Sequence, residues 1–65
     1  MQLKILLTAY NDWNSLYLVA EKIHDTFKNT EWKDYELLIV NDGSIEKIDK
    51  NKDLKSKYTL INLLN

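Results

Sequence analysis

Apolar residues in this chain gather in three short runs that are separated by polar stretches. The runs cover residues 3–9, 35–41 and 58–64. The first is too short and too continuously apolar for a surface helix, and it fits a β-strand buried on both faces, as the second run also does. The pattern therefore predicts three strands, of which the first two are fully buried.

Between the first two runs, apolar residues recur with the spacing of a helix. The stripe consists of Leu16, Val19, Ala20, Ile23 and Phe27, at positions i, i+3, i+4, i+7 and i+11. Such a stripe is typical of an amphipathic helix, here expected over residues 14–28. Asp12 or Asn14 can cap its first turn, because a short side-chain oxygen accepts a hydrogen bond from an amide without a helical partner. Trp13 is expected to cover the start of this helix, with stacking on a ligand as the alternative.

The order of these elements predicts the topology. Strand, helix and strand within about forty residues form a βαβ unit, which is right-handed in nearly all cases and has parallel strands. Residues 45–57 are rich in lysine and have three apolar anchors, Ile45, Ile48 and Leu54, so a weak helix or a loop is expected there. The predicted fold class is α/β, with a three-stranded parallel sheet in the order 3-2-1 and helices on one face.

A sheet with helices on one face leaves its other face uncovered, and the first strand then forms a bare edge. Uncovered apolar faces and open strand edges are sites of association. We therefore expect the chain to self-associate through the uncovered sheet face or by exchange of an edge strand.

Composition and charge narrow the range of partners. Nine basic and ten acidic residues give a formal net charge of -1, so no net field attracts nucleic acid or anionic lipid. The lysines of residues 47–57 alternate with acidic residues, which is typical of a solvated face. The chain has no cysteine, which excludes disulfides and thiolate zinc sites. No window approaches the roughly 18 to 20 apolar residues of a membrane span, and the apolar start ends too early for a signal peptide, so a cytoplasmic location is expected.

Polar side chains follow the first two predicted strands at the point where each ends. Residues 9–12 and 41–44 emerge at the same edge of a parallel sheet, and open α/β sheets bind ligands at that edge. Gly43, the single glycine of the chain, allows a positive φ and a close approach of the main chain to a ligand. Asp42 can accept hydrogen bonds from a base ring nitrogen or a ribose hydroxyl. The alternative is purely structural, with Asp42 and Gly43 in a turn and Ser44 capping a following helix.

Two segments at this edge resemble a known family. The segments are LLTAYNDWNSL, residues 6–16, and YELLIVNDGS, residues 35–44. They resemble the N-terminal part of the family 2 glycosyltransferases, which have the GT-A nucleotide-sugar fold and include dolichyl-phosphate mannosyltransferase. In that family the first strand ends in a P-x-Y-N-E-type motif and the second in a D-D-G-S-type motif. The resemblance covers nearly the whole chain and implies that residues 1–65 are a single partial domain, the Rossmann-like N-terminal part of this fold.

Carried over residue by residue, the resemblance implies a nucleotide-binding site. Ala9, Tyr10 and Asp12 would line the nucleotide pocket, with Tyr10 packed on the base ring. Asp42 would contact the base of the sugar donor, and Gly43 would lie beside it. The implied ligand is a nucleoside-diphosphate sugar.

The chain departs from the family pattern at several points. Thr8 stands in place of the usual proline and Asn41 in place of the first aspartate. Family members also carry a D-x-D-type motif farther along, whose carboxylates hold Mg²⁺ or Mn²⁺ against the donor diphosphate, and then a catalytic base. Asp49 and Asp53 lie in a lysine-rich connection and do not replace that motif. We therefore expect no metal site and no catalytic residue in these 65 residues, and no sugar transfer by this chain alone.

Two other interpretations stay open. One is a non-catalytic, self-associating βαβ interaction module, or a truncated open reading frame, whose sheet face pairs with itself or with another chain. The other is a fragment of a response-regulator-like domain, which the segment of residues 10–12 fits poorly because such a domain needs paired acidic residues after its first strand.

Overall fold

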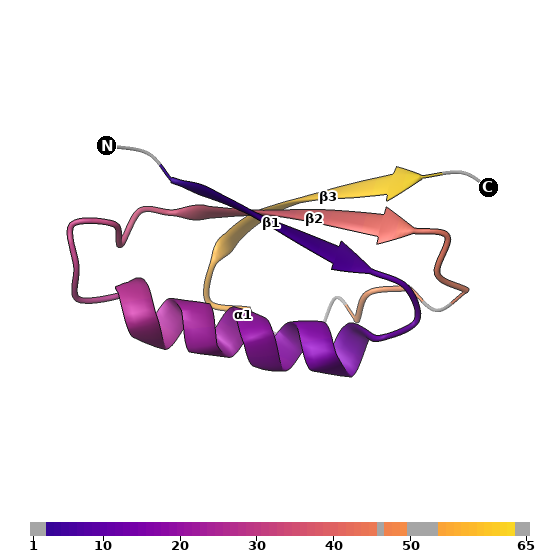
Figure 1. Ribbon diagram of the computed structural model, residues 1–65, viewed down its shortest axis with the longest axis horizontal. Helices are drawn as coiled ribbons and strands as arrows, with labels where there is room; N and C mark the ends of the chain where they lie inside the picture. The colour runs from indigo at the N-terminus through magenta and orange to yellow at the C-terminus, as the bar shows by residue number, and fades with distance from the viewer. Residues whose placement is uncertain (1–2, 46, 50–53, 64–65) are drawn as a thin grey trace.

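The structure is a computed structural model that describes residues 3–45, 47–49 and 54–63. It contains strand β1 (Lys4–Ala9), helix α1 (Trp13–Phe27), strand β2 (Glu36–Asp42) and strand β3 (Lys57–Leu63), as Figure 1 shows. Each element begins and ends within one residue of the bounds predicted from the sequence. Position 64 of the third predicted strand lies outside the described residues.

β2 lies at the centre of the sheet. It pairs in parallel with β1 on one side and with β3 on the other, which gives the order β1-β2-β3. Parallel neighbours need a crossover connection, and α1 provides it between β1 and β2. The prediction of an α/β fold with a three-stranded parallel sheet in this order is confirmed.

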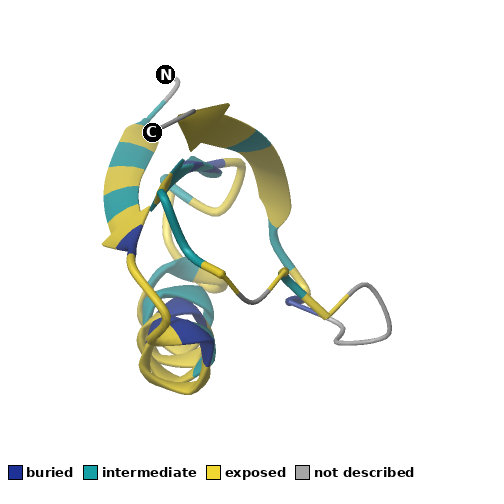
Figure 2. Ribbon diagram, turned by 90° about the vertical axis from the view of Figure 1, so that its right-hand side faces the viewer, coloured by how far each residue is buried: buried dark blue, intermediate teal, exposed yellow. Residues whose placement is uncertain are grey.

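α1 covers one face of the sheet (Figure 2). Its buried side chains Trp13, Leu16 and Ala20 form one hydrophobic cluster with Leu37 and Ile39 of β2, both of which are 0% exposed. The helix spans 15 residues, and no helix in the described part of the chain is long and apolar enough to cross a membrane. The core therefore lies between α1 and the central strand.

One residue of the predicted helical stripe lies elsewhere. Val19 is 43% exposed, whereas Tyr17 packs against the core cluster. The buried face of α1 is centred near Leu16 and Ala20 and turns toward Trp13, so Val19 lies about a quarter turn from its centre. The predicted inclusion of Val19 in the core is wrong.

The two faces of each strand differ in burial, which corrects the prediction that β1 and β2 are buried on both faces. In β1, Leu7 is half-buried against the core, whereas its neighbour Leu6 is 62% exposed. In β2, Leu37 is buried and Leu38 is half-buried. Continuous apolar runs are typical of sheets covered on both faces, but in the described structure α1 covers one face.

We call the sheet face opposite α1 the open face. Side chains alternate along a strand and paired residues share a face, so the register defines its members. They are Lys4, Leu6, Thr8, Glu36, Leu38, Val40, Asp42, Lys57, Thr59, Ile61 and Leu63. The expected uncovered face is thus found among the described residues.

The described part of residues 45–57 contains no helix before β3 begins at Lys57. Residues 46 and 50–53 of the predicted weak helix or loop lie outside the described residues. Leu54 is buried and Ile48 is partly buried against the core cluster, so two of the three predicted apolar anchors are confirmed. The third is wrong, because Ile45 is 89% exposed.

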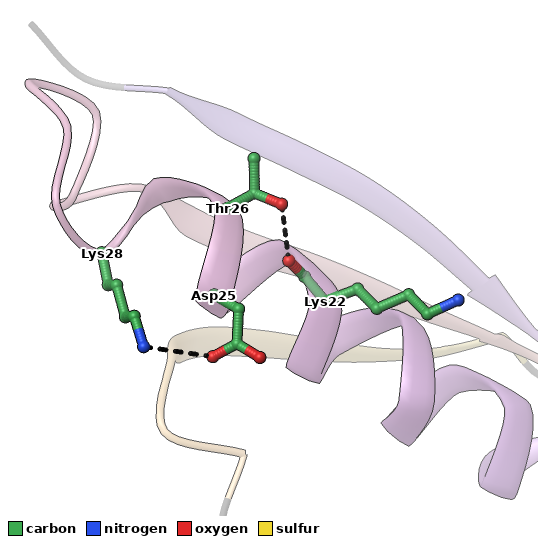
Figure 3. Close-up of polar contacts among 4 residues, drawn as sticks. All are labelled: Lys22, Asp25, Thr26 and Lys28. Carbon is green, nitrogen blue, oxygen red and sulfur yellow. Dashed lines mark hydrogen bonds and ion pairs between the residues drawn. The ribbon is translucent and has the colours of Figure 1, made fainter.

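Local contacts support the last turns of α1 (Figure 3). The Thr26 hydroxyl donates a hydrogen bond of 2.8 Å to the Lys22 carbonyl, and Lys28 Nζ lies 3.6 Å from Asp25 Oδ1. Both charged side chains of this ion pair are about half exposed, at 48% and 61%, so water screens it and it contributes little to stability. The helix is therefore stabilised mainly by its buried face.

Candidate functional site

β1 and β2 end side by side at one edge of the sheet, which we call the carboxyl edge. The register pairs Ala9 of β1 with Asn41 of β2. The chain leaves the sheet from these neighbouring positions into two loops, one before α1 and one after Asp42 (Figure 1). The two segments that carry the family resemblance are therefore adjacent in space.

Hydrogen bonds join the two loops directly. The Asn11 main-chain N–H donates to Ser44 Oγ at 2.8 Å, and the Ile45 main-chain N–H donates to Asn11 Oδ1 at 2.8 Å. Ser44 thus bridges the loops, and the described residues that follow it form no helix for it to cap. The structural alternative of a Ser44 helix cap is not found in this part of the chain.

Each loop contains a residue with a positive φ. The value is 54° at Asn11 and 75° at Gly43. Glycine adopts this region freely, and asparagine tolerates it better than most other residues do. The predicted positive φ of Gly43 is confirmed, whereas the matching role of Asn11 was missed, although its residue type and its place between a strand and a helix could have indicated it.

Asn41 extends the hydrogen bonds to the third strand. Its Nδ2 donates to Asn62 Oδ1 at 2.9 Å, and its Oδ1 accepts from the Ser44 main-chain N–H at 3.0 Å. The bond between Asn41 and Asn62 ties the ends of β2 and β3 together.

Asp12 organises the first loop in an unexpected way. It occupies the N-cap position of α1, but its side chain makes no capping hydrogen bond. Instead Asp12 Oδ1 accepts a hydrogen bond of 2.7 Å from the Tyr10 main-chain N–H. The predicted side-chain cap at Asp12 is wrong, and Asn14, the other candidate, lies inside the helix.

The five predicted nucleotide-contacting residues differ in exposure. Ala9 is 2% exposed and belongs to the core, whereas Tyr10 is 65% exposed. Asp12 and Asp42 are exposed, and Gly43 is partly buried. A ligand at this edge would therefore contact Tyr10, Asp12 and Asp42, whereas Ala9, main chain included, is buried in the core.

Asp42 is placed to accept hydrogen bonds from a ligand. Alternation along β2 directs Asn41 to the side of α1 and Asp42 to the open face. No hydrogen bond or ion pair of the Asp42 carboxylate is found in the described part of the chain, in contrast to that of Asp12. Its acceptor oxygens are exposed next to the joined loops.

A cavity of about 650 Å³ opens beside the joined loops, on the side of β3. Its lining residues are Asn41, Gly43, Ser44, Ile45, Lys47, Ile48, Leu60, Asn62 and Leu63. Small-molecule sites have volumes of roughly 300 to 1,000 Å³, so this one is large enough for a ligand. Gly43 is the predicted site residue in the lining, and Lys47, which the sequence pattern assigned to a solvated face, adds a positive charge.

Trp13 is unsuited to stacking on a ligand. It is 5% exposed at the first position of α1, and its ring stacks on that of Tyr17 with the centroids 6.5 Å apart. The prediction that Trp13 covers the helix start is confirmed.

The carboxylates at this edge do not form a metal-binding cluster. Within the described residues, no group of three or more histidine, aspartate or glutamate side chains is placed to hold a metal ion.

No protein-family model, curated protein or solved structure matches this chain. A functional assignment therefore depends on the geometry of the carboxyl edge and on the residues that form it.

Proposed function

We propose that the carboxyl edge binds the nucleotide part of a nucleoside-diphosphate sugar, and that the chain is the donor-binding N-terminal segment of a family 2-like glycosyltransferase. The observation that carries the proposal is the direct joining of the two loops, in which Asn11 binds both Ser44 and Ile45. A nucleotide site of the expected kind needs both motifs on one surface, and these hydrogen bonds hold them together.

The exposed groups at this edge suit the chemistry of a nucleoside. An ionised Asp42 has acceptors alone, so it pairs with a donor such as a ring N–H of uracil or guanine, or with a ribose hydroxyl. The Tyr10 ring, in a residue that is 65% exposed, provides an aromatic surface on which a base can stack. Gly43, with no side chain, allows the ligand to approach the main chain closely.

The adjacent cavity is lined by four apolar residues, Ile45, Ile48, Leu60 and Leu63, and, among the described residues, offers the diphosphate one cation, Lys47. Lys47 lines it and supplies a positive charge, and the amide side chain of Asn62 lines it as well. Charge-assisted hydrogen bonds from an ammonium group are among the stronger interactions available to a phosphate oxygen. We assign the base and ribose to Tyr10 and Asp42, and the diphosphate to this cavity.

The proposal includes donor binding but no catalytic residue. Sugar transfer needs stabilisation of the charge that develops on the leaving nucleoside diphosphate and a base for the acceptor hydroxyl. The groups described above bind and orient the donor. The purified 65-residue chain should therefore bind nucleotide without transferring sugar, and measured glycosyl transfer by this chain would contradict that division of roles.

An amide NMR titration tests the proposal. Isotope-labelled protein receives uridine diphosphate or guanosine diphosphate, each with Mg²⁺, and tripolyphosphate serves as a control polyanion. We expect the peaks of Tyr10, Asp12, Asp42 and Gly43 to move together and to saturate with one of the nucleotides. Asp34, which precedes β2 at the opposite end of the sheet, should not respond.

Two outcomes would count against nucleotide binding. A folded spectrum that responds to neither nucleotide would favour the alternative, a non-catalytic module that acts through its open face. Shifts that tripolyphosphate reproduces in full would show attraction of a polyanion to lysines and no recognition of the nucleoside.

A further inference from the structure

The open face carries a charge pattern that a second copy of the chain can match. The register arranges its residues in rows across the sheet. Lys4, Glu36 and Lys57 form the row at the amino end, and Asp42 lies in the row at the carboxyl end. One end of the face therefore has a net positive charge and the other a negative charge.

The two rows between these ends hold four apolar residues and two threonines, Thr8 and Thr59. Leu6 is in register with Leu38 in the second row, and Val40 is in register with Ile61 in the third. Leu6 is 62% exposed and Ile61 is 40% exposed. Clustered exposed apolar groups with a charged rim are typical of a protein interaction surface.

We propose that the chain forms a homodimer through the open face, with the strands of the two copies antiparallel. Turning one copy end over end places the second row of one sheet on the third row of the other. Leu38 of each copy then lies over the partner's Val40, and Asp42 reaches the amino-end row of the partner. A parallel arrangement would instead place one positive row on the other, which like-charge repulsion opposes.

The packing angle of two sheets directs Asp42 toward a lysine. Packed sheets cross at about 30°, and Asp42 lies about three residues, or roughly 10 Å, from the middle of its strand. The crossing displaces Asp42 by about 5 Å, which is one strand spacing. In each copy, Lys4 lies on one side of Glu36 and Lys57 on the other. Whether the two sheets cross in one direction or the other, Asp42 of one copy therefore lies over a lysine of the partner. Glu36 itself accepts a hydrogen bond of 2.9 Å from Thr59 Oγ1.

The size of the open face indicates a weak dimer. Three strands about 4.8 Å apart, with residues about 3.3 Å apart along each strand, give a contact of a few hundred Å² per copy. A stable complex of standard size buries about 800 Å² per partner. We therefore expect the dimer to form at high micromolar to millimolar protein concentration.

Sedimentation equilibrium over a wide concentration range tests the dimer. Wild-type protein should change from monomer to dimer as its concentration rises, and Asp42→Lys should weaken the association about tenfold, because each dimer contains two such contacts. Asp34→Lys, an exposed change of the same kind outside the open face, should have no effect. A wild-type chain that stays monomeric up to millimolar concentration would overturn the proposal.

Mixing charge variants tests the antiparallel arrangement. Asp42→Lys is mixed in turn with Lys4→Glu and with Lys57→Glu, and circular dichroism verifies that each variant is folded. In one of the two mixtures, the new lysine at position 42 of one chain faces the new glutamate of the other, and the second contact keeps its original aspartate and lysine. That mixture should associate about as strongly as the wild type. Failure of both mixtures with folded chains would overturn the arrangement.

A measurement on unaltered protein covers the case in which a variant unfolds. A sample that combines labelled and unlabelled wild-type chains is examined by isotope-filtered NOE spectroscopy. Contacts between Leu38 methyls of one chain and Val40 methyls of the other support the antiparallel dimer. Contacts between chains that involve main-chain groups of β1 or β3 alone would show edge pairing and overturn it.

Discussion

Asn11 is the residue on which the geometry of the carboxyl edge depends most. Its φ of 54° turns the chain from β1 toward α1, and its side chain and main chain both bind the second loop. Few residue types combine tolerance of this φ with a side-chain acceptor of the right length. Asparagine at this position therefore provides both the turn and the link.

Two substitutions at Asn11 separate these roles. Asn11→Gly keeps the positive φ and loses the side-chain bond, so we expect the free energy of unfolding to fall by about 1 kcal/mol. Asn11→Ala loses the bond and also strains the backbone, so a fall of about 2 kcal/mol is expected. Urea denaturation followed by circular dichroism measures both. Equal losses for the two variants would contradict a requirement for positive φ.

At the scale of single residues, the sequence indicates backbone conformation from residue type, but it does not indicate which residues form hydrogen bonds with each other. The positive φ of Gly43 follows from its being the single glycine beside a strand end. The bond between Asn11 and Ser44 joins residues 33 positions apart, and it forms only because parallel pairing brings two loops together. Asp12 is one of the two predicted helix caps, but its carboxylate accepts a hydrogen bond from the Tyr10 main-chain N–H instead.

At the scale of elements, α1 packs on one face of the sheet, and its buried side chains form one cluster with those of the central strand in the described part of the chain. Leu37 and Ile39 of β2 are 0% exposed beneath α1, whereas Leu38 between them faces the open side. A domain of this size has a small core, so each buried side chain contributes a large share of its stability. Neighbouring residues of β2 should therefore differ sharply in their effect on folding.

The matched pair Leu37→Ala and Leu38→Ala tests this difference. Removing the buried Leu37 side chain should lower the free energy of unfolding by about 2 to 5 kcal/mol, enough to unfold much of the protein. The half-buried Leu38 should contribute about 1 kcal/mol in dilute solution. Thermal denaturation of both variants at low protein concentration provides the comparison. Equal losses of unfolding free energy would contradict a core that includes Leu37 and excludes Leu38.

The number, order and approximate bounds of the described elements could be read from the sequence, as could part of the buried face of α1, but the burial of the two strand faces could not. A run such as that of β1 has the same pattern whether one face of the sheet is covered or both are. The predicted apolar stripe includes Val19 at one margin, whereas the helix buries Trp13 and packs Tyr17 against the core at the other. Pattern alone does not say which of two neighbouring stripes a helix buries.

At the scale of the whole molecule, the two proposals meet at one residue. Asp42 lies at the carboxyl edge, where we place the nucleoside, and also on the open face, where we place a second copy. One carboxylate that serves both partners makes the two binding events compete. Competition of this kind is reciprocal, because each ligand lowers the affinity for the other by the same factor.

This coupling predicts an effect of nucleotide on association. At a protein concentration that gives a mixture of monomer and dimer, saturating nucleotide should shift the population toward monomer. Sedimentation velocity with and without nucleotide measures the shift, and tripolyphosphate serves as the control ligand. An unchanged population at saturation would show that Asp42 is not shared.

The most direct test of the central claim, nucleotide binding at the carboxyl edge, is the affinity of matched aspartate variants. Calorimetry with uridine and guanosine diphosphates and Mg²⁺ compares the wild type with Asp42→Asn and Asp34→Asn, which change exposed aspartates near opposite ends of β2. Asp42→Asn keeps an amide oxygen that accepts a hydrogen bond but loses the negative charge, and a hydrogen bond to a charged group contributes roughly 1 kcal/mol more than a neutral one. Asp42→Asn should therefore bind about five times more weakly, while Asp34→Asn should bind as the wild type does. A wild type that binds neither nucleotide, or an Asp42→Asn variant of unchanged affinity, would contradict the proposed site.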